Sequence, residues 1–218
     1  MARPSRNLDH ALLSSGRLLF PEFGCGGMSV RTLAEHAGVN QAMFHYHFNS
    51  KDDFLRTLLQ QFYEEMFGAL TLAVDHEGSA ALRLRHALHT IARFVRTHRR
   101  VVARLWNDVM SGQEVAREFM LRNAPRHVGL LFSLAAEAQA QGDLAEIAPA
   151  QMFSFLMGAV LLPMIFIGGL IDATGGRLPM LQEFDAAVLS DAAIDERIDR
   201  AIGAMSRRPA ARPNRSRR

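Results

Sequence analysis

The chain has 218 residues, of which 49% are hydrophobic and 22% charged, so it can bury the core of one large domain, or of a small domain plus a larger one. Its single cysteine, Cys25, excludes a disulfide framework and fits a reducing compartment. The first ten residues are polar and charged, unlike a secretory signal. We therefore expect a cytoplasmic protein.

Two short helices are predicted between residues 29 and 48. Ser29 can cap the first by accepting a backbone N–H, and Gly38 suits the left-handed residue that ends it. Asn40 is a strong cap for the second helix, which we expect from Gln41 to Phe48. Two helices joined by a short turn with a glycine are typical of the helix-turn-helix, whose second helix enters the DNA major groove.

The second helix is expected to have two unlike sides. Phe44 and Phe48 are four residues apart and form its buried side. Amide, methyl and aromatic groups on an exposed helix suit base edges, thymine methyls and phosphates. The side left exposed carries Gln41, Ala42, Met43, His45, Tyr46 and His47.

A third helix is expected after Ser50, with Asp52 and Asp53 in a first turn that favours negative charge. The segment from about Leu12 to Leu55 resembles the DNA-binding domain of the TetR family of transcriptional regulators. The resemblance rests on a series of short sequence motifs that occur in the same order as in the family: Leu19-Phe20, Gly24, Ser29-Val30, Leu33-Ala34, Ala37-Gly38-Val39, Tyr46-His47-Phe48 and Ser50-Lys51.

This resemblance implies an all-α fold, with an N-terminal three-helix helix-turn-helix domain and a larger helical domain for ligand binding and dimerisation. It implies that Ser29 and Lys51 hold the DNA backbone from helix ends. In the recognition helix it implies base contacts from Gln41, Ala42 and Met43, and phosphate or base-edge contacts from His45, Tyr46 and His47.

Two positions depart from the family pattern. Asn40 stands where Ser or Thr is usual, which leaves the cap intact. His45 stands where Tyr is usual, so its phosphate contact is either lost or strengthened at low pH, since histidine titrates near neutrality. The operator sequence therefore cannot be taken from a relative.

Basic residues have an uneven distribution. Lys51 is the only lysine among 25 basic residues, and it suits either a phosphate contact or the surface beside an acidic first turn. Residues 79–104 hold seven arginines and no acid, which indicates a solvated face paired with acids elsewhere or a patch for DNA or an anion. Residues 206–218 form a basic segment with two prolines, expected to be disordered and either to add DNA affinity or to aid solubility.

The sequence after Lys51 reads as a series of helices, expected at residues 51–74, 80–97, 101–110, 114–141, 149–172 and 180–205, the last broken near Ser190. Domain boundaries are expected at 1–51 for the DNA-binding domain, 52–205 for the effector-binding and dimerisation domain, and 206–218 for the tail.

The run from Met152 to Ile171 is apolar enough to cross a bilayer. Pro163 and several glycines interrupt it, however, and no cluster of basic residues flanks it. A helix that is apolar all round can also be buried against a partner subunit, and the resemblance implies a dimeric four-helix bundle here. We expect a homodimer through helices near 149–172 and 180–205, with no membrane contact. The second helix would contribute Phe184, Val188, Ile194, Ile198 and Ile202.

A ligand pocket is expected among the helices between residues 101 and 172, although core packing is the commoner use of each residue type. Methionines among the candidates suit adaptable, hydrophobic ligands. The possible polar anchors are Arg104, Asn107 and His127, and the candidate apolar lining is Trp106, Met110, Phe119, Phe132, Phe153, Met157 and Met164.

The sequence has no phosphate-binding glycine loop, no nucleophile elbow and no Cys-X-X-Cys. We therefore expect no catalytic site, metal or cofactor. The predicted function is a TetR-like regulator that binds a double-stranded DNA operator, most simply a repressor released from a palindromic site by a small hydrophobic effector. The alternatives are an activator or partner-controlled regulator of the same fold, and a helical protein anchored in a membrane by residues 152–171.

Overall fold

The computed structural model describes residues 7–175, 177 and 179–206, and over these the chain is helical with no strand. The predicted all-α class is confirmed. The predicted basic tail lies outside the described residues from 207 onward. The helices are α1 (Asn7–Gly27), α2 (Val30–Ala37), α3 (Gln41–His47), α4 (Lys51–Val74), α5 (Ala80–Thr97), α6 (Arg99–Met110), α7 (Glu114–Ala140), α8 (Pro149–Leu156), η1 (Met157–Leu161), α9 (Leu162–Thr174), α10 (Pro179–Phe184), η2 (Asp185–Leu189) and α11 (Asp191–Met205).

The predicted helix starts in the N-terminal part are made by side-chain caps. The Ser29 hydroxyl accepts from the Thr32 amide at 3.0 Å, and the Asn40 side chain accepts from the Met43 amide at 2.9 Å. Gly38 ends α2 in the left-handed region, with φ 69°, which a residue with a Cβ rarely adopts. The left-handed Gly38 and the Asn40 cap together fix the turn between α2 and α3.

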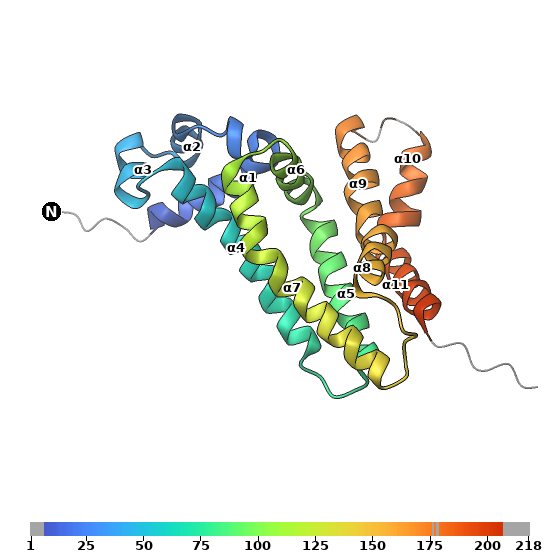
Figure 1. Cartoon of the computed structure of the whole chain (residues 1–218). Coiled ribbons are helices and arrows are strands. Elements are labelled where there is room, and N and C mark those ends of the chain that lie inside the picture. Colours follow the sequence, from blue (N-terminus) through green and yellow to red (C-terminus); the bar gives the residue numbers. More distant parts are fainter. Residues whose placement is uncertain (1–6, 176, 178, 207–218) are drawn as a thin grey trace, which may run out of the picture.

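The helices are arranged as a small N-terminal group, which consists of α1, α2 and α3, attached to a long bundle (Figure 1). Helices α2 and α3 lie at the end of the molecule away from α8 to α11, and α4 runs from this group into the bundle beside α7 and α5. Helix α6 contacts α1 on one side and α7 and α9 on the others. It therefore connects the N-terminal group with the rest of the chain.

Two clusters of buried apolar residues form the core. One is centred on Phe20, Phe44 and Phe54 and continues along α4 to Phe62, with residues of α6 and α7. The other lies between α4, α5, α7, η1 and α11. The packing of the N-terminal group thus extends beyond residue 51, because the first turns of α4 belong to it.

The apolar segment expected as one helix is divided into α8, η1 and α9. It turns one side towards the core, with Met152, Leu156, Val160 and Met164 buried at intervals of four residues. By length and composition alone, one helical stretch of the described chain, Pro149–Thr174, could cross a membrane, and 22% of its most apolar part is buried in the protomer. A core helix of a soluble protein meets the same criterion.

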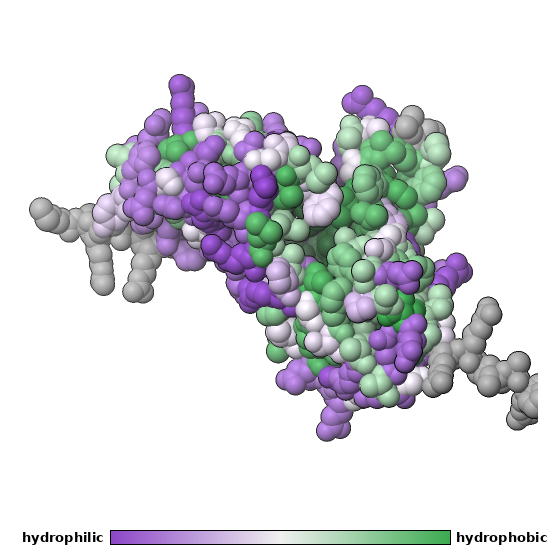
Figure 2. Space-filling view, in the orientation of Figure 1, coloured by the Kyte–Doolittle hydropathy of each residue, from purple (hydrophilic) through white to green (hydrophobic). Residues whose placement is uncertain are grey.

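The outward side of this segment stays apolar. Phe166 is 65% exposed and Leu170 is 50% exposed. Figure 2 shows hydrophobic residues gathered over α8 and α9, whereas the N-terminal group is mostly hydrophilic. Phe166 and Leu170 thus form part of an exposed apolar surface on α9.

The expected break near Ser190 is confirmed, since Ser190 is extended and caps α11. The expectation that Ile194 and Ile198 contact a partner is wrong. Both are fully buried inside the protomer core, because α11 packs that side against α5.

Most arginines between residues 79 and 104 pair with acids. The prediction that this arginine-rich face is paired with acidic residues elsewhere is therefore confirmed. Arg99, for example, makes a two-pronged contact with Asp172 at 2.8 and 2.9 Å. The other pairs are Arg83–Glu137, Arg85–Asp199, Arg93–Asp191, Arg96–Asp191 and Arg104–Asp108.

Candidate nucleic-acid interface and ligand cavity

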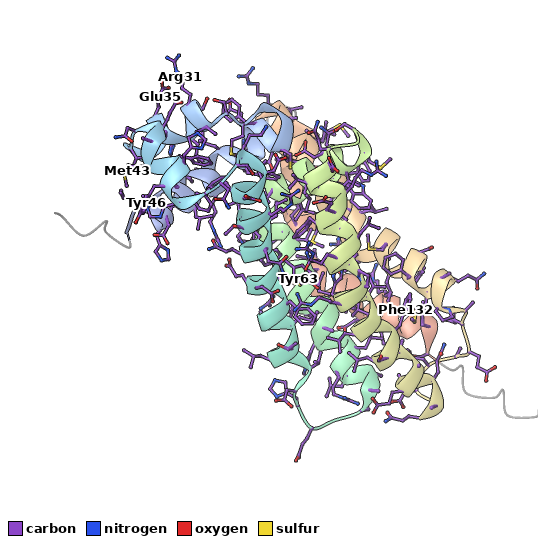
Figure 3. All side chains as sticks on the ribbon, turned by 60° about the vertical axis from the view of Figure 1, so that its left-hand side comes forward. Arg31, Glu35, Met43, Tyr46, Tyr63 and Phe132 are labelled. Carbon is purple, nitrogen blue, oxygen red and sulfur yellow. The ribbon has the colours of Figure 1, made fainter. Side chains whose placement is uncertain are left out.

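Helix α3 is held by its aromatic side and exposes the other. The rings of Phe44 and Phe48 lie 5.5 Å apart, and each packs against Phe54 of α4. Tyr46 is 66% exposed, and Figure 3 shows it and Met43 pointing away from the body of the protein. The exposed members of the predicted DNA-contacting set are Gln41, Ala42, His45 and Tyr46, with Met43 and His47 half-buried.

The two predicted backbone-holding residues lie at the ends of neighbouring helices. Ser29 is exposed, and its hydroxyl caps α2. Lys51 is half-buried, and its Nζ donates to the carbonyl of Cys25 at 3.0 Å. An ammonium group carries three hydrogens, so this bond leaves two for an oxygen ligand such as a phosphate.

Helix α1 is bent at Gly24, which has φ 61°. A Cβ at this position would lie 2.0 Å from Nε of Arg104, so only glycine fits. The residue after the bend, Cys25, is buried, and desolvation together with the nearby Asp108 carboxylate raises the pKa of its thiol to about 12. A thiol held neutral in this way is a poor redox switch.

Asp108 of α6 anchors this bend and was not predicted from the sequence. Its carboxylate is 1% exposed and accepts from the Cys25 amide at 2.7 Å. Arg104 lies 3.2 Å from the same carboxylate and also donates to the carbonyl of Phe23 at 2.8 Å. The sequence does show that Arg104 and Asp108 are four residues apart on one helix, a spacing that predicts an ion pair between them.

A cavity of about 230 Å³ lies between α4, α5, α6, α7, α8, η1 and α9. Its walls are almost wholly apolar, and the polar side chains among them are Tyr63, Trp106 and His127. The lining residues are Leu59, Phe62, Tyr63, Met66, Ile91, Phe94, Val95, Val101, Val102, Leu105, Trp106, Phe119, Met120, Ala124, His127, Val128, Phe153, Met157, Leu161, Leu162 and Ile165.

The structure brings half of the predicted ligand residues together at this cavity: Trp106, Phe119, His127, Phe153 and Met157. Phe132 lines a neighbouring void of about 20 Å³ instead. Arg104 is engaged at the α1 bend, Asn107 is exposed, Met110 is 76% exposed and Met164 is fully buried in the core. Tyr63, which the sequence did not single out, lies within the bundle (Figure 3).

Comparison with known proteins agrees with this geometry. Residues 12–58 match the family model of bacterial regulatory proteins, tetR family. The chain is 27% identical over 111 residues to the "Probable HTH-type transcriptional regulator YttP" of Bacillus subtilis (strain 168). That alignment covers 50% of this chain and 54% of the relative, so the chain spans about half the length of the relative it matches.

Solved structures share the fold over nearly the whole chain. The ketosteroid transcriptional regulator KstR2 of Mycobacterium tuberculosis has a TM-score of 0.65 and 17% identity, covering 94% of this chain and 97% of that one. A TetR family transcription regulator from Marinobacter aquaeolei VT8 has a TM-score of 0.64 and 15% identity, covering 93% and 97%. Residues 12–58 of this chain are therefore similar to the DNA-binding segment of the tetR family of bacterial regulatory proteins, and the chain shares its fold with solved structures of TetR family regulators.

Proposed function

We propose that this chain is a homodimeric, DNA-binding transcriptional regulator, a repressor that a small apolar molecule releases from a palindromic operator. The observation that carries the proposal is the exposed side of α3, held by buried aromatic rings within the segment that matches the tetR family model. Exposed Gln41 and Tyr46 supply groups that hydrogen-bond base edges and phosphates. Lys51 keeps hydrogens free for the DNA backbone.

A dimer follows from the apolar outer side of α8 and α9, which a second copy would cover. Contiguous exposed apolar surface of this kind marks an interaction site. A two-fold dimer presents two recognition helices to half-sites roughly 34–36 Å apart, or a multiple of that spacing. The two-fold symmetry of such a dimer is the reason for proposing a palindromic operator.

Release by a ligand is supported by the position of α6. Its residues Val101 and Trp106 line the cavity, while Asp108 of the same helix holds the bend of α1. A ligand that prefers a shifted α6 would also shift α1 and the recognition helix. It must bind the DNA-incompetent state more tightly, since a ligand with equal affinity for both states shifts nothing.

The test selects the operator from random double-stranded DNA and measures binding by fluorescence anisotropy. Replacing Tyr46 with Ala should weaken binding by about 5- to 150-fold, through the loss of contacts worth about 1–3 kcal/mol. The matched control is Leu121→Ala, which truncates a side chain that is 77% exposed on α7, and it should leave affinity unchanged. Equal affinity of Tyr46→Ala and the native protein would refute the assignment of α3.

Repression is tested with a reporter gene placed behind the selected operator. Expression should rise when the regulator is absent and when Tyr46→Ala replaces it. A fall in expression in both cases would instead identify an activator.

A further inference from the structure

We propose that the cavity takes an uncharged, mainly apolar molecule of about nine non-hydrogen atoms that carries one hydroxyl or N–H donor, for which the unpaired ring nitrogen of His127 is the acceptor. A phenol or a medium-chain alcohol has this chemistry. The inference rests on the proposed function only in locating the effector in this cavity.

The size follows from the cavity volume. An apolar protein cavity of roughly 150 Å³ holds benzene, so the space of about 230 Å³ accommodates about nine non-hydrogen atoms in proportion. Larger ligands would require the helices to separate.

The lack of charge follows from the walls. Within the described part of the chain, no Asp, Glu, Lys or Arg lines the cavity. Arg126 of α7 stacks over Phe67 at 4.2 Å and over the ring of the lining residue Tyr63 at 4.9 Å, but its charge is paired with Glu64 and it does not itself line the cavity. An ionised ligand would lose its hydration with no counter-charge among the lining residues, so it should bind far more weakly than a neutral ligand of the same size.

The donor on the ligand follows from the hydrogen bonds of Tyr63 and His127. The Tyr63 hydroxyl donates to the carbonyl of Asn123 at 2.8 Å, so its proton is already engaged. The His127 ring also bonds to the backbone of Asn123, one turn earlier on α7, and its Nδ1 lies 3.5 Å from the Tyr63 hydroxyl, whose proton is used. We therefore take Nδ1 as the nitrogen that carries the hydrogen of the neutral ring. Nε2 is then the bare acceptor.

This acceptor is free in the structure. Among residues 7–175, 177 and 179–206, the side-chain contact made by the His127 ring is the one from Nδ1 to Tyr63, and it leaves Nε2 for a ligand. Burial lowers the pKa of His127, so the ring is uncharged at neutral pH and still accepts. The indole of Trp106 also lines the cavity but is 41% exposed and keeps contact with water. His127 is therefore the group that selects the ligand's polar atom.

The experiment measures binding to the full chain by calorimetry, without DNA, using three aromatic probes with equal numbers of non-hydrogen atoms. These are 4-ethylphenol, which has a donor, 4-ethyltoluene, in which a methyl replaces the hydroxyl, and benzoate, which is charged. The phenol should bind, and the benzoate should bind at least a hundredfold more weakly.

The His127→Phe variant should lower the affinity ratio of phenol to toluene about tenfold, because a buried donor is left unpaired. His127→Gln retains an acceptor and should restore part of that ratio, which separates loss of the acceptor from misfolding. The matched control His86→Phe changes a half-buried histidine outside the cavity and should leave the ratio unchanged.

The inference is overturned if the benzoate binds as tightly as the phenol, if none of the probes binds, or if His127→Phe weakens phenol and toluene equally. Operator binding is measured separately and without ligand. If the protein binds no operator but binds the phenol as described, the proposed regulator is rejected and the ligand chemistry is retained. If it binds an operator but not the phenol, the ligand chemistry is rejected and the regulator is retained.

Discussion

The carboxylate of Asp108 accepts a 2.7 Å hydrogen bond from the backbone amide of Cys25, which lies 83 residues away in the sequence. Helix α6, which carries Asp108, also forms a wall of the cavity, and Cys25 lies just after the bend of α1. This contact joins the N-terminal group to the helix that would sense a ligand.

Replacing Asp108 with Ala should lower the free energy of unfolding by about 2–3 kcal/mol, because the Cys25 amide and Arg104 lose their buried partner. Urea denaturation measures the change. The control Glu22→Ala removes an exposed acid from α1 and should alter stability by no more than about 0.5 kcal/mol. Equal effects of the two variants would show that the Asp108 contact contributes nothing.

Gly24→Ala and Gly68→Ala should change stability in opposite directions. Alanine at position 24 would have an unfavourable φ of 61° and a Cβ 2.0 Å from Arg104, so the melting temperature should fall by several degrees. Gly68 is an exposed residue within α4 with no atom within 4 Å of an added Cβ, so alanine there should stabilise the chain by about 0.5–1 kcal/mol. Differential scanning calorimetry distinguishes these signs, and a stable Gly24→Ala would refute the close approach.

Lys51→Met should reduce the salt dependence of operator binding. Each phosphate contact contributes about 0.9 to the slope of log affinity against log salt concentration, so each protomer should lose about that amount. Lys51→Arg retains the charge and should keep the native slope. If Lys51→Met also keeps the slope, the residue serves only to hold the Cys25 carbonyl.

Acidification should destabilise the protein. Burial lowers the pKa of His89, His98 and His127 from the ordinary value of 6.5. The unfolded chain therefore binds more protons just below pH 6.5, and the free energy of unfolding falls as the pH drops through this range. Thermal melts from about pH 7.5 to about pH 5.5 should show this fall, and His127→Phe should make it smaller. A melting temperature that rises on acidification would contradict the assignment.

Phe166→Glu should dissociate the proposed dimer, since Phe166 is 65% exposed on the apolar outer side of α9. Sedimentation without detergent should give about twice the chain mass of 24.2 kDa for the native protein and the mass of one chain for the variant. Leu72→Glu changes a residue that is 72% exposed at the far end of α4 and should remain dimeric. A native protein that needs detergent to stay in solution would favour the membrane alternative.

The local features of the fold were predictable because their causes are local. Ser29 and Asn40 each bond an amide three residues ahead, so the cap can be read directly from the sequence. The exposed side of α3 follows in the same way from the spacing of Phe44 and Phe48.

Features that depend on packing between distant helices were not predictable. Helical periodicity shows that Ile194 and Ile198 share an apolar side, but only the structure shows that α5 covers it. Arg104 and His127 were equally plausible ligand anchors in the sequence, yet Arg104 turns to the α1 bend and His127 to the cavity. The Tyr63 contact that orients His127 joins residues 64 positions apart.

Phe94 and Phe119 pack against both core clusters and also line the cavity. Because the same two rings belong to both cores, neither core can melt without exposing surface of the other. The chain should therefore unfold in one calorimetric transition rather than two, although it has the layout of two domains. A molecule bound between these rings would raise the temperature of that single transition for the whole chain, the DNA-binding helices included.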